Sequence, residues 1–134
     1  MRDENDAVVG DRDELETFPK PYDMTMAHDT TWTIVIPGRG SLIGHELERV
    51  TPEYIKLLES IRASGKPWTG SYEAQSSVGP AKNGMGVIVG GTGEFERARG
   101  YMTEENHFRA IDVQKQVYVV RNRMTFYFTS KVPR

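Results

Sequence analysis

The sequence predicts a small, mainly β protein, an antiparallel barrel or sandwich with one α-helix. Three observations predict this fold class. Most of the chain after residue 66 consists of runs rich in β-branched and aromatic residues, which favour strands. Only short turns separate these runs, and short turns join antiparallel neighbours. A single stretch, residues 51–64, has the periodicity of an amphipathic helix.

The expected strands follow one another closely along the chain. The first run is β-branched and aromatic, and the Pro-Gly-Arg-Gly sequence at 37–40 ends it. The longest run comes last and precedes the C-terminus. Residues 41–50 mix apolar and charged side chains, and no element is assigned to them. The expected strands are 31–36, 68–77, 85–89, 97–103, 108–113 and 117–129.

The helix at 51–64 has clear start and stop signals. Thr51 suits the N-cap and Pro52 suits the first helical position, where no N–H is needed. Gly65 provides the C-terminal stop. The apolar residues Tyr54, Leu57, Leu58 and Ile61 fall on one stripe, so one face of this helix packs against another element.

Composition excludes several classes of protein. The 134 residues are enough for one domain, and the net charge of −2 does not indicate a nucleic-acid binder. Cysteine is absent, which excludes disulfide scaffolds, thiolate zinc sites and cysteine nucleophiles. No apolar run is long enough to span a membrane, and no signal-peptide pattern is visible at the N-terminus. We therefore expect a cytoplasmic protein without membrane or nucleic-acid partners.

Charge divides the chain into two parts. Residues 1–30 hold 9 acidic and 3 basic side chains, whereas residues 31–134 hold 10 acidic and 14 basic ones. The sequence therefore predicts a flexible acidic segment over 1–30 and a single β-barrel domain over 31–134. Such a segment is either a solvated tail or a lid that closes over the more basic body.

The glycine-rich turn at 90–93 follows an apolar strand run, as phosphate-binding loops do. Its spacing is not GxGxxG, no Lys-Ser/Thr pair follows, and no amphipathic helix comes next. A nucleotide cofactor is therefore not expected, and four small residues that turn one strand into another explain the segment. No cofactor of another kind is indicated.

The same segment resembles a known superfamily. The string Val89-Gly90-Gly91-Thr92-Gly93-Glu94-Phe95, followed by Ala98 and Gly100, is similar to the signature of the allene oxide cyclase and dirigent barrels. The β-branched and aromatic final strand also fits these proteins. The resemblance covers about residues 84–128. It implies an allene-oxide-cyclase-like, or calycin-like, barrel and a homo-oligomer, either a dimer or a trimer.

The resemblance also implies cofactor-free chemistry on a small molecule. Small bacterial relatives include spirocyclases and Diels–Alderases of natural-product biosynthesis. A barrel of this size encloses one small ligand and holds a flexible chain, such as a polyketide, near its reactive shape. We therefore expect an enzyme, a cyclase or isomerase that closes a ring by a [4+2] or spiro-forming step. A non-catalytic small-molecule-binding barrel and a protein-interaction module are the alternatives.

Candidate site residues are polar side chains on otherwise apolar strands. Tyr72, Glu73 and Arg121 form the predicted catalytic set, which binds and polarises a substrate oxygen. The alternative for the face of the last strand that carries Arg121 is exposure to solvent. The alternative for Trp32 and Trp68 is packing in the core. The predicted substrate-binding set is Trp32, Trp68, Gln75, Arg99, Tyr101, Met124 and Phe126.

A metal site is not expected. The three histidines, His28, His45 and His107, lie far apart in the sequence without the spacing of metal ligands. The adjacent pair His45 and Glu46 suits acid–base work, but a surface position is the simpler interpretation.

Overall fold

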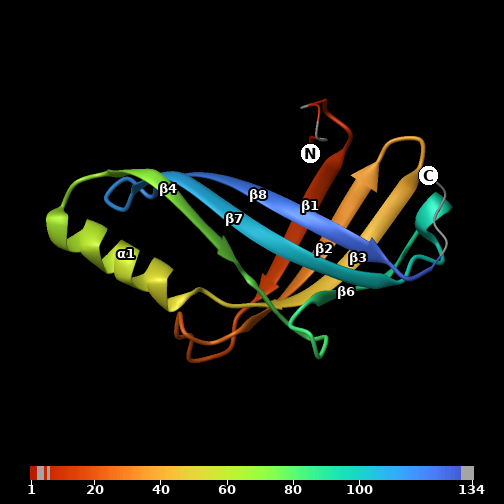
Figure 1. The fold of residues 1–134 in the computed structure, drawn as a ribbon, viewed down its shortest axis with the longest axis horizontal. Coiled ribbons are helices and arrows are strands. Elements are labelled where there is room, and N and C mark those ends of the chain that lie inside the picture. The colour runs from red at the N-terminus through yellow and green to blue at the C-terminus, as the bar shows by residue number, and fades with distance from the viewer. Residues whose placement is uncertain (3–4, 6, 131–134) are drawn as a thin grey trace.

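The computed structural model describes residues 1–2, 5 and 7–130 and is mainly β. One helix and one short 3-10 turn interrupt a series of eight strands (Figure 1). The elements are β1 (Asp11–Thr17), β2 (His28–Ile36), β3 (Gly40–Glu48), α1 (Pro52–Ser64), β4 (Trp68–Gln75), β5 (Ser77–Gly79), β6 (Gly86–Gly91), η1 (Gly93–Phe95), β7 (Gly100–Asp112) and β8 (Val117–Phe128). No helix in these described ranges is long and apolar enough to cross a membrane.

The strands form one curled antiparallel sheet, a half-barrel. Its order is β1-β2-β3-β6-β7-β4, with β5 on β3 and β8 on β7. The long strand β7 pairs with β6 and β4 along one edge and with β8 along the other. Within the described part of the chain, β1 pairs only with β2, and β8 pairs only with β7. β1 and β8 are therefore edge strands. The predicted mainly β, barrel-like fold with one helix is confirmed.

The helix begins and ends where the sequence predicts. The Tyr54 amide donates to Thr51 Oγ1 over 3.3 Å, which caps the N-terminus. Gly65 ends the helix in the left-handed conformation, at φ +65°, and its N–H donates to Ile61 and Arg62 carbonyls. The helix buries Leu58 and Ile61 against one end of the sheet (Figure 1).

Two apolar clusters hold the sheet. The larger consists of Trp32, Ile34, Leu42, Ile88, Phe95, Ala98 and Met102, with Met124 and Phe126 of β8 packed against it. The smaller joins Leu58 and Ile61 of α1 to Ile111 of β7, with partly buried Tyr54, Trp68 and Phe108 around them. Between these clusters, β3 and β7 place the buried glutamates Glu46, Glu48 and Glu104 on the inner face of the sheet. These residues form a polar middle layer, which is described below as part of the candidate site.

The N-terminal segment differs from the expectation of a flexible tail. Residues 11–17 form β1 and pair along their whole length with β2, from Asp11 opposite Val35 to Thr17 opposite Asp29. β2 itself starts at His28, earlier than residue 31. The edge strand β1 accommodates its acidic residues because their side chains point into solvent or toward the polar interior. Residues 3, 4 and 6 of the predicted segment lie outside the described residues.

Two further elements differ from the expected ones. Most of the stretch 41–50, to which the sequence assigns no element, belongs to β3, with Leu42, Gly44, Glu46 and Glu48 facing inward. The expected strands at 97–103 and 108–113 are one continuous strand, β7. Glu104 and Asn106 have the composition of a turn, but they point into the polar middle of the half-barrel.

The turn at 90–93 packs tightly against the start of β3. Thr92 and Ser41 exchange hydrogen bonds, through Thr92 N to the Ser41 carbonyl at 2.8 Å and Ser41 N to Thr92 Oγ1 at 3.0 Å. This approach leaves no space at Gly91, where a Cβ would overlap the Ser41 carbonyl oxygen. The small residues of this segment are therefore required by packing.

Gly91→Ala is expected to lower the free energy of unfolding by about 3 kcal/mol, because the clash is with backbone that cannot move aside. Gly84→Ala is the matched control, since Gly84 has φ +78° but open space around its Cβ position. Its expected cost is about 1 kcal/mol. Urea unfolding of both variants measures the difference, and equal costs would contradict the packing explanation.

Candidate functional site

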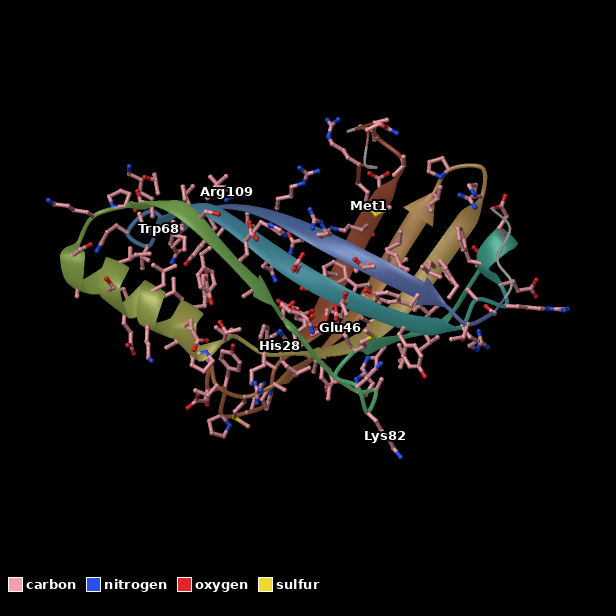
Figure 2. The ribbon with its side chains drawn as sticks, viewed as in Figure 1. Met1, His28, Glu46, Trp68, Lys82 and Arg109 are labelled. Carbon is pink, nitrogen blue, oxygen red and sulfur yellow. The ribbon has the colours of Figure 1, made fainter. Side chains whose placement is uncertain are left out.

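The half-barrel forms a partly open cavity of about 230 Å³ between its polar middle layer and the first turn of α1. β1, β2, β3, β4, β7 and β8 all contribute to its wall. In Figure 2, His28 and Glu46 mark the centre of the fold, and Trp68 lies toward the helix. The lining residues are Glu14, Glu16, His28, Glu48, Arg49, Val50, Thr51, Tyr54, Ala74, Gln75, Ser76, Glu104, Asn106, Phe108 and Asn122.

Three buried glutamates meet at one wall of this cavity, where Glu48 and Glu104 line it and Glu46 lies next to them. Glu46, Glu48 and Glu104 are 0%, 6% and 1% exposed, and one carboxyl oxygen of each lies within 4.8 Å of the others. Glu46 and Glu48 are two apart on β3, so strand alternation puts both on the inner face. Glu104 reaches the same place from β7.

Neutral donors hold two of these carboxyl groups in position. Trp32 Nε1 donates to Glu46 Oε1 over 2.6 Å, and Ser77 Oγ donates to Glu46 Oε2. Glu104 accepts from Ser76 Oγ at 2.6 Å and from Asn122 Nδ2 at 2.5 Å. These bonds connect β2, β5 and β8 to the cluster and fix its geometry.

Burial and mutual repulsion change the protonation of the cluster. Burial, followed by the nearby charges of Glu104 and Glu46, raises the pKa of Glu48 to about 9. Burial also raises the pKa of Glu46, although the bonds from Ser77 and Trp32 oppose the shift. Carboxyl groups this close do not all ionise together. At neutral pH Glu48 therefore carries a proton.

Glu14 is the glutamate whose protonation changes near neutral pH. It lies on β1 opposite Trp32, and it forms part of the cavity wall. Burial of the carboxyl group, followed by the charges of Glu104 and Glu16, raises its pKa to about 7, although part of the residue is exposed to solvent. A carboxyl group with this pKa is present in both forms at neutral pH, as proton transfer requires.

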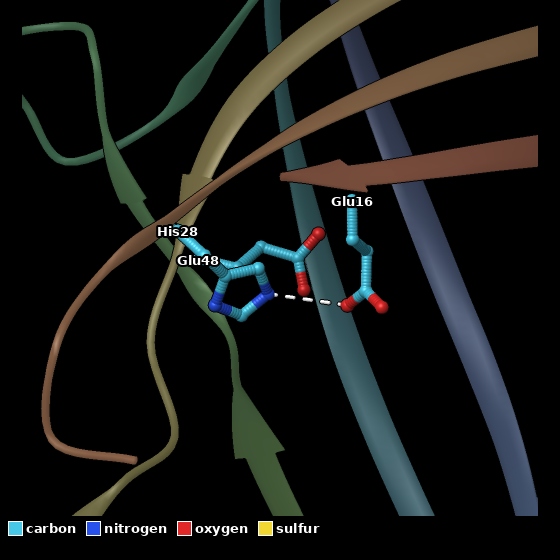
Figure 3. A group of neighbouring side chains, drawn as sticks. All are labelled: Glu16, His28 and Glu48. Atoms are coloured by element: carbon cyan, nitrogen blue, oxygen red, sulfur yellow. Dashed lines mark hydrogen bonds and ion pairs between the residues drawn. The ribbon is translucent and has the colours of Figure 1, made fainter. Parts of the chain in front are cut away.

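A histidine and two glutamates meet at one side of the cavity. His28 Nε2 and Glu16 Oε1 are 3.1 Å apart, and Glu48 lies beside them (Figure 3). The His28 ring also packs on Phe18, with centroids 4.7 Å apart. Within the described part of the chain, the buried atoms His28 Nδ1 and Glu48 Oε1 have no hydrogen-bond partner.

Aromatic rings form the wall on the helix side. Tyr54 of α1 stacks on Phe108 of β7 with centroids 4.5 Å apart. Tyr72 lies beside both rings, and its hydroxyl is 2.6 Å from Thr51 Oγ1. Burial, with smaller contributions from Tyr118 and Tyr72, raises the pKa of Tyr54 to about 12, so this phenol stays neutral.

The structure distributes the predicted site residues over both faces of the sheet. Of the predicted catalytic set, Tyr72 touches the aromatic wall, whereas Glu73 and Arg121 lie on the outer face beside His107. Of the predicted binding set, Gln75 lines the cavity, Trp32 holds Glu46, and Trp68 packs against the helix cluster. Met124 and Phe126 pack on the larger core cluster, while Arg99 and Tyr101 are exposed.

The acidic residues of the cavity are absent from the predicted set. Glu14, Glu16, Glu48 and Glu104 line it, with Glu46 directly beneath. One signal was available: alternation from Leu42 through Gly44 to Glu46 and Glu48 puts two glutamates on an apolar face. His28 and Glu16 come from segments that the sequence assigns to a flexible tail.

Two sets of these side chains have spacing that a metal ion could use. They are Glu16, His28 and Glu48, and Glu46, Glu48 and Glu104. In the first set His28 Nε2 already faces Glu16, and in the second Trp32, Ser77, Ser76 and Asn122 already occupy carboxyl oxygens. These contacts give Glu16, Glu46 and Glu104 protein partners, whereas Glu48 Oε1 has none among the described residues.

The fold and the site together define a class: an open, helix-capped β half-barrel with an acidic and partly aromatic internal cavity. Comparison with known proteins adds no relative to this description. The chain matches no protein-family model, no curated protein and no solved structure.

Proposed function

We propose that the protein is a cofactor-independent cyclase or isomerase that holds a small molecule in the half-barrel and moves a proton on it with Glu14. The observation that supports this proposal best is the position of Glu14, a carboxyl group with a pKa of about 7 on the wall of a 230 Å³ cavity. The signature at 89–100, which resembles the allene oxide cyclase and dirigent barrels, supports the cyclase class. We also propose that the protein is cytoplasmic and forms a homo-oligomer.

The wall suggests how such a reaction proceeds. The stacked rings of Tyr54 and Phe108 contact the apolar body of a polyketide-like chain and hold it in a folded shape. Ionised Glu14 takes a proton from the substrate and, once protonated, returns it at another atom, so protons balance over the cycle. Burial of its own carboxyl group, and next the charges of Glu104 and Glu16, keep the pKa of Glu14 near neutrality, because all of them oppose its ionisation.

Deletion of the gene in its native host tests this function. We expect an isomer of the normal product, equal in mass but different in chromatographic retention, to accumulate in the deletion strain. Purified protein should convert this isomer to the normal product. An unchanged metabolite profile would contradict the proposal, whereas binding without conversion would favour a non-catalytic barrel.

A further inference from the structure

We propose that the ligand of this cavity carries a protonated amine, which binds between Glu16 and Glu48. This inference rests on the proposed function, since it names the substrate class of the same site.

The wall carries more acidic than basic groups. β1 contributes Glu14 and Glu16, β3 contributes Glu48, and β7 contributes Glu104. The basic groups in the lining are His28 of β2 and the exposed Arg49 that follows β3. Glu46 adds a further carboxyl group directly below the lining. Because Glu48 carries a proton at neutral pH, the negative charge of the lining comes from Glu14, Glu16 and Glu104. An anionic ligand meets repulsion from these groups, and a cationic ligand meets attraction that partial exclusion of water strengthens.

Glu48 provides an acceptor that needs a donor. The residue is 6% exposed, and its Oε1 has no partner in the part of the chain that the structure describes. An unpaired buried acceptor is unfavourable, so an N–H of a ligand that reaches Glu48 Oε1 after a small rotation of the side chain stabilises the complex. The three groups face one another in Figure 3, and atoms of Glu16, His28 and Glu48 lie within 4.8 Å of one another.

A primary ammonium group matches this arrangement. It has three N–H donors, so it can donate to the Glu16 carboxylate and to Glu48 Oε1 together. Glu16 is 40% exposed, so the group binds there without losing all of its hydration. A neutral hydroxyl has one donor and satisfies one of the two acceptors.

The rest of the cavity fits an organic body. It has a volume of about 230 Å³, and the Tyr54 and Phe108 rings form one wall. Aromatic faces attract cations, and they also pack on apolar groups. A bare metal ion would use neither the volume nor these rings, which favours an amine with an aromatic or alkyl body.

Three probes of similar shape and different charge test the proposal: benzylammonium, benzyl alcohol and benzoate. We expect calorimetric titration of the full chain at neutral pH to give benzylammonium a Kd at least about tenfold below that of benzyl alcohol. Benzoate should show no saturable binding. Glu16→Gln, which removes a charged acceptor, and Glu48→Leu, which removes the buried acceptor oxygen, should each weaken benzylammonium binding severalfold. Glu59→Gln, an equal charge change on the exposed face of α1, is the matched control and should change nothing.

Equal binding of the three probes, or no binding of benzylammonium at millimolar concentration, would overturn the amine proposal. Displacement of benzylammonium by micromolar Mn²⁺ would also overturn it, because the carboxyl groups would then form a metal site. An unchanged metabolite profile in the deletion strain contradicts the cyclase proposal alone, while charge-selective binding would still support the amine. The isomer that accumulates gives an independent check, since it should be retained by a cation exchanger.

Discussion

Glu14→Gln is expected to lower turnover of the accumulated isomer by about two to four orders of magnitude. Glutamine keeps the size and polarity of the side chain but neither accepts nor releases a proton at neutral pH. The fold should persist, because Glu14 lies on an edge strand and belongs to neither apolar cluster. In the wild type, turnover should also fall below about pH 7, where protonation removes the base form of Glu14.

Initial rates with isomer isolated from the deletion strain measure this effect. Glu59→Gln is again the control for a lost charge, and circular dichroism checks that each variant is folded. A Glu14→Gln variant with more than about a tenth of wild-type turnover would contradict the proposed role of Glu14 in proton transfer. Catalysis would then depend on the folding of the substrate by the aromatic wall alone.

Thermal stability is expected to fall as pH rises from about 5.5 to about 8.5, with Glu48 as the largest single source. The pKa of Glu48 is about 9 in the folded protein and 4.5 for the unperturbed group. Between these values the folded state binds more protons than the unfolded state, so the free energy of unfolding decreases with rising pH. This contribution is complete below about pH 4.5 and is lost as pH passes about 9. The raised pKa values of Glu46 and Glu14 act in the same direction.

Glu48→Gln tests this expectation, because the neutral amide replaces a carboxyl group that is already protonated. The variant should match the wild type near pH 5.5 and exceed its Tm by about 5 °C or more near pH 8.5. Scanning calorimetry over this pH range gives both values, with Glu59→Gln as the control. If wild type and Glu48→Gln show the same dependence on pH, Glu48 is ionised in the folded protein and the described protonation is wrong.

The parts of the fold that local sequence determines could be predicted. Thr51, Pro52 and Gly65 specify the ends of α1, and the structure confirms them. The Val-Tyr-Val-Val run of β8 also shows its strand character directly. β1 and β3 could not be predicted in this way. Their strand conformation depends on pairing with β2, and residues such as Asp13 and Glu46 have low strand propensity of their own.

The acidic residues of the candidate site could not be predicted from the sequence for a related physical reason. Its glutamates come from three strands, and no local spacing connects Glu14 on β1 with Glu48 on β3 and Glu104 on β7. Each of them looks like a solvent-exposed charge when it is considered alone. Glu73 and Arg121 show the opposite case. They are charged residues on apolar strands and were therefore predicted as site residues, but both lie on the outer face of the sheet. The direction of a side chain depended on β-bulges, such as that between Thr69 and Tyr72, which sequence periodicity does not show.

The position of β1 has a consequence for how such a protein evolves. The strand contributes Glu14 and Glu16 to the cavity but no residue to either apolar cluster. Selection can therefore change the charges on this strand with little penalty in folding, whereas changes in β3 or β7 affect chemistry and stability together. A library confined to residues 11–17 would search new substrate specificities while most of its members still fold.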